Sequence, residues 1–204
     1  MTTKCLAWRV GTALATVFLA SSTLAQTDNF DDNNDTGWTR MSPLEPYGAP
    51  AAFTVAGGQY RLQAPASPLP GTVGPGRAGS LINGDGLGAF RISVDLVTWD
   101  DSLDQVFGIL ARVAEPGLGT LDGYALTYVN EQGTTSAELD ILRIRDENSS
   151  GGTLASVKIR LIPGQGYRLV FTGIGAQLTG EVFALTNLTT PLATITASNV
   201  EFAS

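Results

Sequence analysis

The sequence predicts an all-β protein whose strands form an antiparallel sandwich or barrel. Short runs rich in Val, Ile, Leu, Tyr, Phe and Thr recur about every 8–12 residues between Gly, Pro and Asn turn signals. Beyond residue 25 no segment shows helical periodicity of convincing length. No internal repeat is visible either, which argues against a propeller or a β-helix.

The predicted strands follow one another along the whole chain. Residues 52–55 and 59–63 flank Gly57 and Gly58 and read as a hairpin, and the Pro- and Gly-rich residues 64–77 read as a long loop. Residues 90–99 alternate apolar and polar side chains, as expected for a strand with one buried face. Further strands are predicted at residues 105–113, 123–129, 137–145, 156–162, 167–172, 177–185 and 193–197.

The first 25 residues have the pattern of a secretory signal peptide. Lys4 and Arg9 form a short basic region, an apolar run follows, and the segment ends in small residues at Ala25. The apolar run is shorter than the ~20 residues that span a bilayer, so a membrane anchor is the weaker interpretation. We therefore predict a secreted protein, either extracellular or held in the periplasm or at the cell surface, whose mature chain is residues 26–204.

Composition excludes several kinds of chemistry. The chain has no histidine, and its single cysteine, Cys5, lies in the predicted signal peptide, so a Ser-His or Cys-His catalytic pair or a zinc site cannot be built. Without Lys4 and Arg9 the mature chain carries a net charge of −9. Nucleic acid and anionic membranes are therefore not expected partners, because both need a cationic surface. Any metal would be a hard cation bound by oxygen atoms.

Two segments resemble a known family. The opening NFDDNNDTGW, residues 29–38, and the late segment GYRLVFTGIGAQLTGEVFALTNLTTPLATI, residues 166–195, are similar to laminin G-like domains of secreted bacterial proteins. The resemblance extends from about residue 28 to residue 197 and implies the concanavalin A-like jelly roll, with two antiparallel sheets and one concave face. In that superfamily the first strand usually pairs with a strand near the C-terminus. Here the chain stops at Ser204, where the resemblance implies one or two more strands, so we expect a truncated domain with an open sheet edge.

The stretch SAELDILRIRD, residues 136–146, resembles the catalytic strand of family 16 glycoside hydrolases, which share this fold. That strand carries two glutamates, the nucleophile and the acid/base, with an aspartate between them. Glu138 and Asp140 match the first two positions. A bulge after Ile141 would bring Arg143 to the position of the second glutamate, and arginine cannot act as an acid because its pKa lies above ~12. Without a bulge Leu142 takes that position, and it cannot replace the acid either.

The match to the hydrolase strand is short, and alternating charges on a solvated sheet face are common. In either interpretation Glu138, Asp140 and Arg143 are predicted to form an ion-paired cluster, which could bind sugar hydroxyls if it lies on the concave face. Trp99 is a candidate for stacking on a sugar ring, although aromatic residues on strands, such as Tyr124 and Tyr128, more often belong to the core.

Residues 31–37 place oxygen ligands at alternate positions. Asp31, Asn33 and Asp35 have the spacing of a calcium loop, but the glycine and glutamate of an EF-hand are missing, since Thr36 and Ser42 occupy those positions. The segment is therefore either a looser calcium site or a plain solvated turn. No organic cofactor is predicted.

Together these observations predict a secreted, non-catalytic, lectin-like module that binds a polysaccharide, a cell-surface glycan or an extracellular protein. One alternative is a degenerate or unusual glycoside hydrolase related to family 16. Another is a structural or adhesive module without a small ligand, because this fold serves both lectins and enzymes. The sequence does not determine the oligomeric state.

Overall fold

The computed structural model describes residues 26–82, 88–130 and 137–202. The predicted signal peptide therefore lies outside the described residues. None of the helices within these ranges has the length and apolar character needed to span a bilayer.

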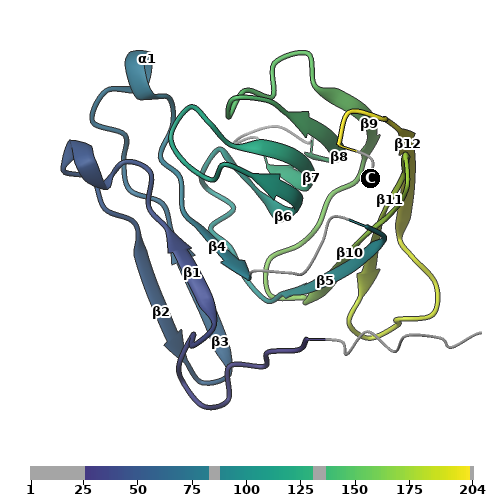
Figure 1. Cartoon of the computed structure of the whole chain (residues 1–204). Helices are drawn as coiled ribbons and strands as arrows, with labels where there is room; N and C mark the ends of the chain where they lie inside the picture. The colour runs from purple at the N-terminus through teal and green to yellow at the C-terminus, as the bar shows by residue number, and fades with distance from the viewer. Residues whose placement is uncertain (1–25, 83–87, 131–136, 203–204) are drawn as a thin grey trace, which may run out of the picture.

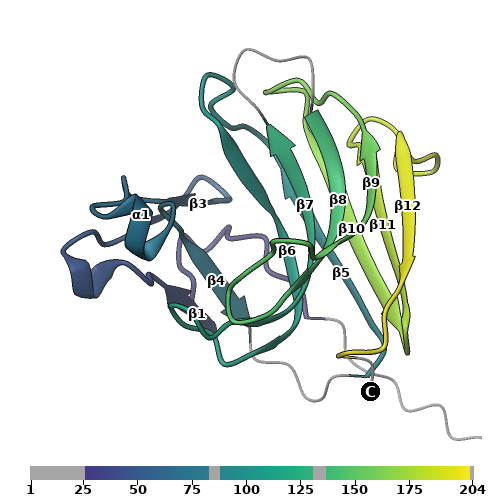
Figure 2. The same ribbon diagram turned by 90° about the horizontal axis from the view of Figure 1, so that it is seen from above.

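Two four-stranded antiparallel sheets pack face to face (Figures 1 and 2). One sheet has the strand order β12-β11-β10-β5, formed by Ala193–Ser198, Gln177–Ala184, Tyr167–Ile174 and Phe90–Leu96. The other has the order β6-β7-β8-β9, formed by Gln105–Ala114, Asp122–Asn130, Ala137–Ile144 and Thr153–Lys158. The predicted all-β, two-sheet antiparallel sandwich is confirmed.

Two small sheets precede the sandwich in the sequence and lie to one side of it (Figures 1 and 2). The hairpin predicted around Gly57 and Gly58 is present as β2 (Ala52–Ala56) and β3 (Gln59–Gln63). The predicted loop that follows contains one helical turn, α1 (Pro70–Val73). A second small sheet pairs β1 (Trp38–Met41) with β4 (Gly79–Ile82), two strands that the sequence pattern did not reveal, and a 3₁₀ turn, η1 (Glu45–Tyr47), follows β1.

The pairing of β1 with β4 corrects one expectation. The resemblance implied that the first strand pairs with a strand near the C-terminus, but Trp38 lies opposite Ile82, and β12 pairs only with β11 within the described residues. The strand predicted at residues 156–162 is also displaced, since β9 ends at Lys158.

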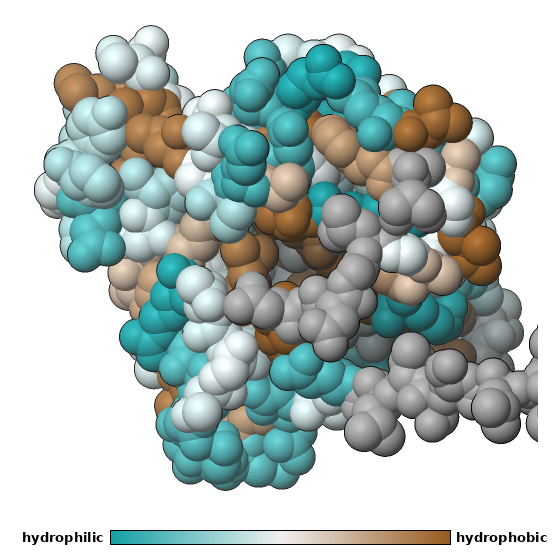
Figure 3. All heavy atoms as spheres, in the orientation of Figure 1, coloured by the Kyte–Doolittle hydropathy of each residue, from teal (hydrophilic) through white to brown (hydrophobic). Residues whose placement is uncertain are grey.

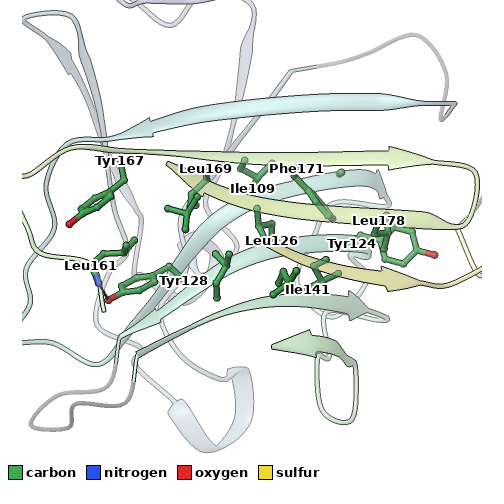
Figure 4. Close-up of a cluster of buried hydrophobic side chains, with 14 of the residues drawn as sticks. Ile109, Tyr124, Leu126, Tyr128, Ile141, Leu161, Tyr167, Leu169, Phe171 and Leu178 are labelled. Atoms are coloured by element: carbon green, nitrogen blue, oxygen red, sulfur yellow. Dashed lines mark hydrogen bonds between the residues drawn. The ribbon is translucent and has the colours of Figure 1, made fainter. Parts of the chain in front are cut away.

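The core lies between the two four-stranded sheets, where alternate side chains of each strand meet (Figure 4). Tyr124 and Tyr128 are fully buried in it, as predicted. The Tyr128 hydroxyl accepts a hydrogen bond from the Leu161 backbone N–H at 3.0 Å, so its polar end is satisfied inside the core. The remaining buried members are Ile109, Ala111, Leu126, Ala137, Leu139, Ile141, Leu161, Tyr167, Leu169, Phe171, Leu178, Val182 and Ile195.

Glycines allow the two sheets to approach and turn. A Cβ atom at Gly180 on β11 would lie 2.3 Å from the Leu126 side chain, so this position holds the sheets close only as glycine. Gly175 begins the two-residue turn between β10 and β11 with φ +53°, a conformation that glycine adopts without strain.

Candidate functional site

Strand β8 presents two carboxylates on one face and core residues on the other. Leu139 and Ile141 are fully buried in the core, so Glu138 and Asp140 project from the opposite, outer face of the sheet. The cross-strand register extends this polar surface, because Asp140 lies between Thr127 on β7 and Ser156 on β9. We call Thr127, Glu138, Asp140 and Ser156 the polar row.

Two oxygens of the polar row are buried without a hydrogen-bond partner among the described residues. They are Oγ1 of Thr127 and Oδ1 of Asp140, whose residues are only 9% and 6% exposed. Ser156 donates a hydrogen bond to Glu138 at 3.1 Å. Buried polar atoms in folded proteins nearly always bind a protein group, an ordered water or a ligand. Thr127 and Asp140 therefore offer unused hydrogen-bonding capacity at this face.

The electrostatic environment of Asp140 is unfavourable for its charge. Burial raises the pKa of Asp140, and the nearby negative charge of Glu138 raises it further, while the neighbouring Ser156 hydroxyl opposes both effects. Burial acts in this direction because it removes water from the charged form. A ligand group that donates a hydrogen bond to Asp140 would relieve this cost.

The outer face borders a wide groove that the N-terminal part of the chain helps to form and that extends past β5 and β6, with Trp99 also in its lining. Thr127 lines this groove together with the apolar side chains of Val106, Leu110, Val129 and Leu142. On its other side lie residues 64–67 and 72–79, among them Ser67, whose buried Oγ also has no partner among the described residues. Figure 3 also shows hydrophobic residues inside a hollow near the centre of the face drawn. The groove thus combines apolar walls with a few unsatisfied oxygens.

An ion pair ties this N-terminal segment to the sandwich. Arg77 forms two hydrogen bonds with Glu147, of 2.5 and 2.8 Å, and also donates to the carbonyl oxygens of Val73 and Pro75. Glu147 lies in the turn after β8 and accepts a further hydrogen bond from the Gly119 N–H. Arg77 therefore fixes α1 and its flanking residues relative to the turns next to the outer face.

Arg143 does not join Glu138 and Asp140, so the predicted three-residue cluster is wrong. The alternation of β8 is unbroken, and Arg143 lies opposite Tyr124 on the inner-face side of the sheet. Its guanidinium group binds Glu201 instead, at 3.1 Å. A bulge does occur beside Ile141 and Leu142, but it lies in the neighbouring strand β9. Ile141 pairs with Ala155 and Leu142 with Thr153, so Leu154 is the extra residue. Leu142 thus follows Glu138 and Asp140 on the outer face.

Trp99 also lies apart from the polar row. Its ring packs against Phe107, Tyr128 and Tyr167, with centroids 5.5, 5.9 and 6.3 Å away, and it is a partly buried member of the core cluster. Its indole N–H donates to Asp101 at 3.3 Å. Since Tyr128 faces inward, Trp99 stands on the core side of the sheet.

The predicted calcium ligands already take part in hydrogen bonds. Asp35 accepts two bonds from Arg40, of 2.6 and 3.0 Å, and one from the Tyr60 hydroxyl at 2.8 Å, and these hold the pKa of Asp35 below its usual value. Asn33 accepts from the Gly57 N–H, and Asp31 from the Asn29 side chain. Within the described ranges no group of three or more Asp, Glu, His or Cys side chains could hold a metal ion. Calcium binding through Asp31, Asn33 and Asp35 stays a prediction.

Sequence reasoning missed Thr127, Ser156 and Ser67. The partners of Glu138 and Asp140 depend on strand register, which a single sequence does not contain. Thr127 did carry a local signal, since it is the one polar side chain between Ala125 and Val129 on its face of β7. A polar residue within an apolar face is the pattern that could have identified it.

Comparisons with known proteins bear on the fold. No family model matches the chain, and no curated protein matches it. Among solved structures it is similar to one described as the CBM2 module of the evolved Dit of Lactobacillus casei BL23 phage J-1, with a TM-score of 0.56 and 16% sequence identity. The similarity covers 85% of this chain and 79% of that chain. At this identity the comparison shows that the two chains share a β-sandwich fold.

Proposed function

We propose that this protein is a secreted, non-catalytic module that binds glycan in the groove beside the polar row. The observation that carries the proposal is a set of buried oxygens, on Thr127, Asp140 and Ser67, that have no hydrogen-bond partner in the described part of the chain. Thr127 and Ser67 line the groove, and Asp140 lies opposite Thr127 on the neighbouring strand. Sugar hydroxyls both donate and accept hydrogen bonds. They can therefore satisfy a carboxylate and a threonine hydroxyl at the same site.

The walls of the groove suit a sugar as well. Val106, Leu110 and Val129 present apolar surface next to the polar oxygens, and Val106 is 59% exposed. Ligand sites commonly combine an apolar lining with a small number of placed polar groups. A sugar chain offers apolar C–H faces and hydroxyl edges, so both parts of the groove find a complementary surface.

Three further lines support the proposal. The similar solved structure is described as a CBM2 module, that is, a carbohydrate-binding module. The resemblance of residues 28–197 to laminin G-like domains indicates extracellular recognition. The signal-peptide pattern of residues 1–25 indicates export, and the charge of −9 on the mature chain disfavours nucleic acid and anionic membranes as partners.

The hydrolase alternative has one observation in its favour. Glu138 and Asp140 are neighbouring carboxylates on one face, and Asp140 has a raised pKa, as an acid catalyst would need. However, Leu142 follows them where the resembling hydrolases carry their second glutamate. A retaining mechanism needs two carboxyl groups about 5–5.5 Å apart on either side of the bond to be cleaved. The arrangement favours binding over cleavage.

A glycan array probed with purified residues 26–204 tests the proposal. Binding to at least one polysaccharide should weaken about tenfold or more in Thr127→Val and in Asp140→Asn, because each loses a hydrogen bond to the sugar. Thr196→Val is the matched control, since Thr196 is exposed on β12 in the other sheet. A blank across neutral and acidic polysaccharides would instead favour the structural or adhesive module, as would binding that survives both site variants.

A further inference from the structure

A second polar hollow lies away from the outer face, beside the turn that joins β8 to β9. Its volume is about 300 Å³, which is at the lower end of the range for ligand pockets. We call it the arginine hollow; its lining residues are Arg143, Arg145, Asp146, Asn148 and Ser150. Arg143 belongs to the inner-face side of β8, so the hollow is separate from the polar row.

Hydrogen-bond donors dominate this lining. Arg143 and Arg145 each present a guanidinium group with five N–H donors. Of these, one hydrogen bond from each group goes to the carboxylate of Glu201, and the Nε of Arg143 is buried without a partner among the described residues. Asn148 uses its side-chain oxygen to accept the Ser150 backbone N–H at 2.8 Å, which leaves its amide donors for another acceptor.

Glu201 shows which chemical group fits the two arginines. Its carboxylate reaches both guanidinium groups from a segment that is distant in sequence and anchored independently. The Glu201 backbone N–H donates to the Asn199 side chain, and Phe202 packs on Tyr124 with ring centroids 5.2 Å apart. The position of Glu201 therefore does not depend on the ion pair alone. The Glu201 carboxylate thus binds both arginines from outside the lining, in which Asp146 is the acid.

We propose that the arginine hollow binds the carboxylate of an acidic sugar, a uronate residue, and that Glu201 competes with it for the same N–H donors. Paired guanidinium groups suit a carboxylate because their donors match its two oxygens in a plane. Asn148 and Ser150 line the same hollow and supply an amide and a hydroxyl that can bind sugar hydroxyls. The hollow is then a second subsite, selective for anionic glycans, on a protein whose net charge is negative.

Calorimetric titration of residues 26–204 with a galacturonate tetramer, beside its carboxyl-reduced neutral counterpart, tests this inference. The acidic tetramer should bind and the neutral one should not bind at this hollow. Arg145→Gln should weaken binding about tenfold or more, because it removes a charge-assisted hydrogen bond. Glu201→Gln should strengthen binding several-fold, because the internal competitor loses its charge. Arg168→Gln is the control, since Arg168 pairs with Asp95 on the other sheet.

Other outcomes would overturn the inference. Equal binding of both tetramers would show that the carboxylate is not recognised, and competition by acetate at equal concentration would show that no sugar is recognised. Weaker binding by a folded Glu201→Gln would mean that Glu201 positions the arginines rather than competes. If the Glu201→Gln variant does not fold, Ser150→Ala is titrated instead. It must weaken binding of the acidic tetramer while leaving the melting temperature of the protein unchanged. The variants Thr127→Val and Asp140→Asn should leave this binding unchanged, so the test is independent of the proposed outer-face site.

Discussion

The Arg77 guanidinium and the Glu147 carboxylate form two parallel hydrogen bonds across 70 residues of sequence. Their side chains are 23% and 13% exposed, so water screens this pair less than an ion pair on the open surface. Each partner also has backbone contacts, Arg77 with Val73 and Pro75 and Glu147 with Gly119. The pair is therefore the centre of a network that holds the N-terminal segment against the sandwich.

Removing Arg77 should loosen that segment. We expect Arg77→Ala to lower the free energy of unfolding by about 1–3 kcal/mol, because charge-assisted hydrogen bonds are lost and Glu147 stays partly buried without its partner. Limited proteolysis should then cut residues 64–78 faster than in the wild type. The more exposed pair Arg168–Asp95 has similar geometry and provides the control, for which Arg168→Ala should cost about 0–1 kcal/mol. Equal losses in the two variants would contradict a special role for Arg77.

The raised pKa of Asp140 predicts how stability depends on pH. The folded state binds this proton more readily than the unfolded state, whose carboxyl titrates near 3.8. The contribution of Asp140 to stability is therefore most favourable below that value, and it decreases as the pH rises through the higher pKa of the folded state. Asp140→Asn should stabilise the protein at pH 7 by about 1 kcal/mol, because a buried charge without a full set of partners is removed.

Urea unfolding at pH 7 and at pH 3.5 measures this effect. The advantage of Asp140→Asn should shrink at the lower pH, where the wild-type carboxyl is mostly protonated in both states. A variant that is destabilised equally at both values would show that Asp140 makes favourable contacts that do not depend on its charge.

We expect no release of reducing sugar from β-glucans. The outer face of β8 presents Glu138, Asp140 and then Leu142, so the second glutamate of the resembling hydrolases has no counterpart on this strand. The sequence predicts the same outcome for either arrangement of this strand, from Arg143 after a bulge or from Leu142 without one, and the structure shows the second. Activity on laminarin or lichenan that is abolished by Glu138→Gln would establish the hydrolase alternative.

Calcium binding by residues 31–35 can be tested against the observed contacts of Asp35. If this loop binds calcium, a free calcium concentration of ten to a hundred times the Kd would stabilise the fold by about 1.4–2.7 kcal/mol. Because such an ion must compete with the Arg40 guanidinium for Asp35, Arg40→Ala should respond to calcium more strongly than the wild type. Thermal melts in calcium and in magnesium at equal ionic strength separate binding from charge screening. An equal shift with magnesium, or a calcium shift that persists in Asp31→Ala, excludes this loop.

The long strands were predictable because one of their faces is buried. The alternation of Leu139 and Ile141 with Glu138 and Asp140 reports the direction of each side chain, and the structure agrees. The four-residue strands β1 and β4 were missed because they are too short to show a period and lie between turn signals. The strand predicted at residues 90–99 is present but ends at Leu96, and Ile92 and Val94 remain 36% and 37% exposed at the sheet edge.

The candidate site was predictable only in part, since it depends on pairing. Glu138 and Asp140 share a strand, so their common face follows from period two alone. The position of Arg143 depended on which of two paired strands carries the bulge, and the sequence pattern could not distinguish β8 from β9. The contact between Arg143 and Glu201 joins segments 58 residues apart, which no local pattern reports.

The pairing of β5 with β10 has a consequence for biosynthesis. Leu96 lies opposite Tyr167, so β5 leaves the ribosome about 70 residues before β10, the one strand that pairs with it in the described ranges. At about 5–20 residues per second, its apolar side chains wait several seconds for β10. Ile92 and Val94 are exposed on the nascent chain during that interval, when an unpaired apolar strand is prone to join another chain. Slow elongation between residues 97 and 166 should therefore lower the yield of folded protein, and a chaperone that shields β5 should restore it.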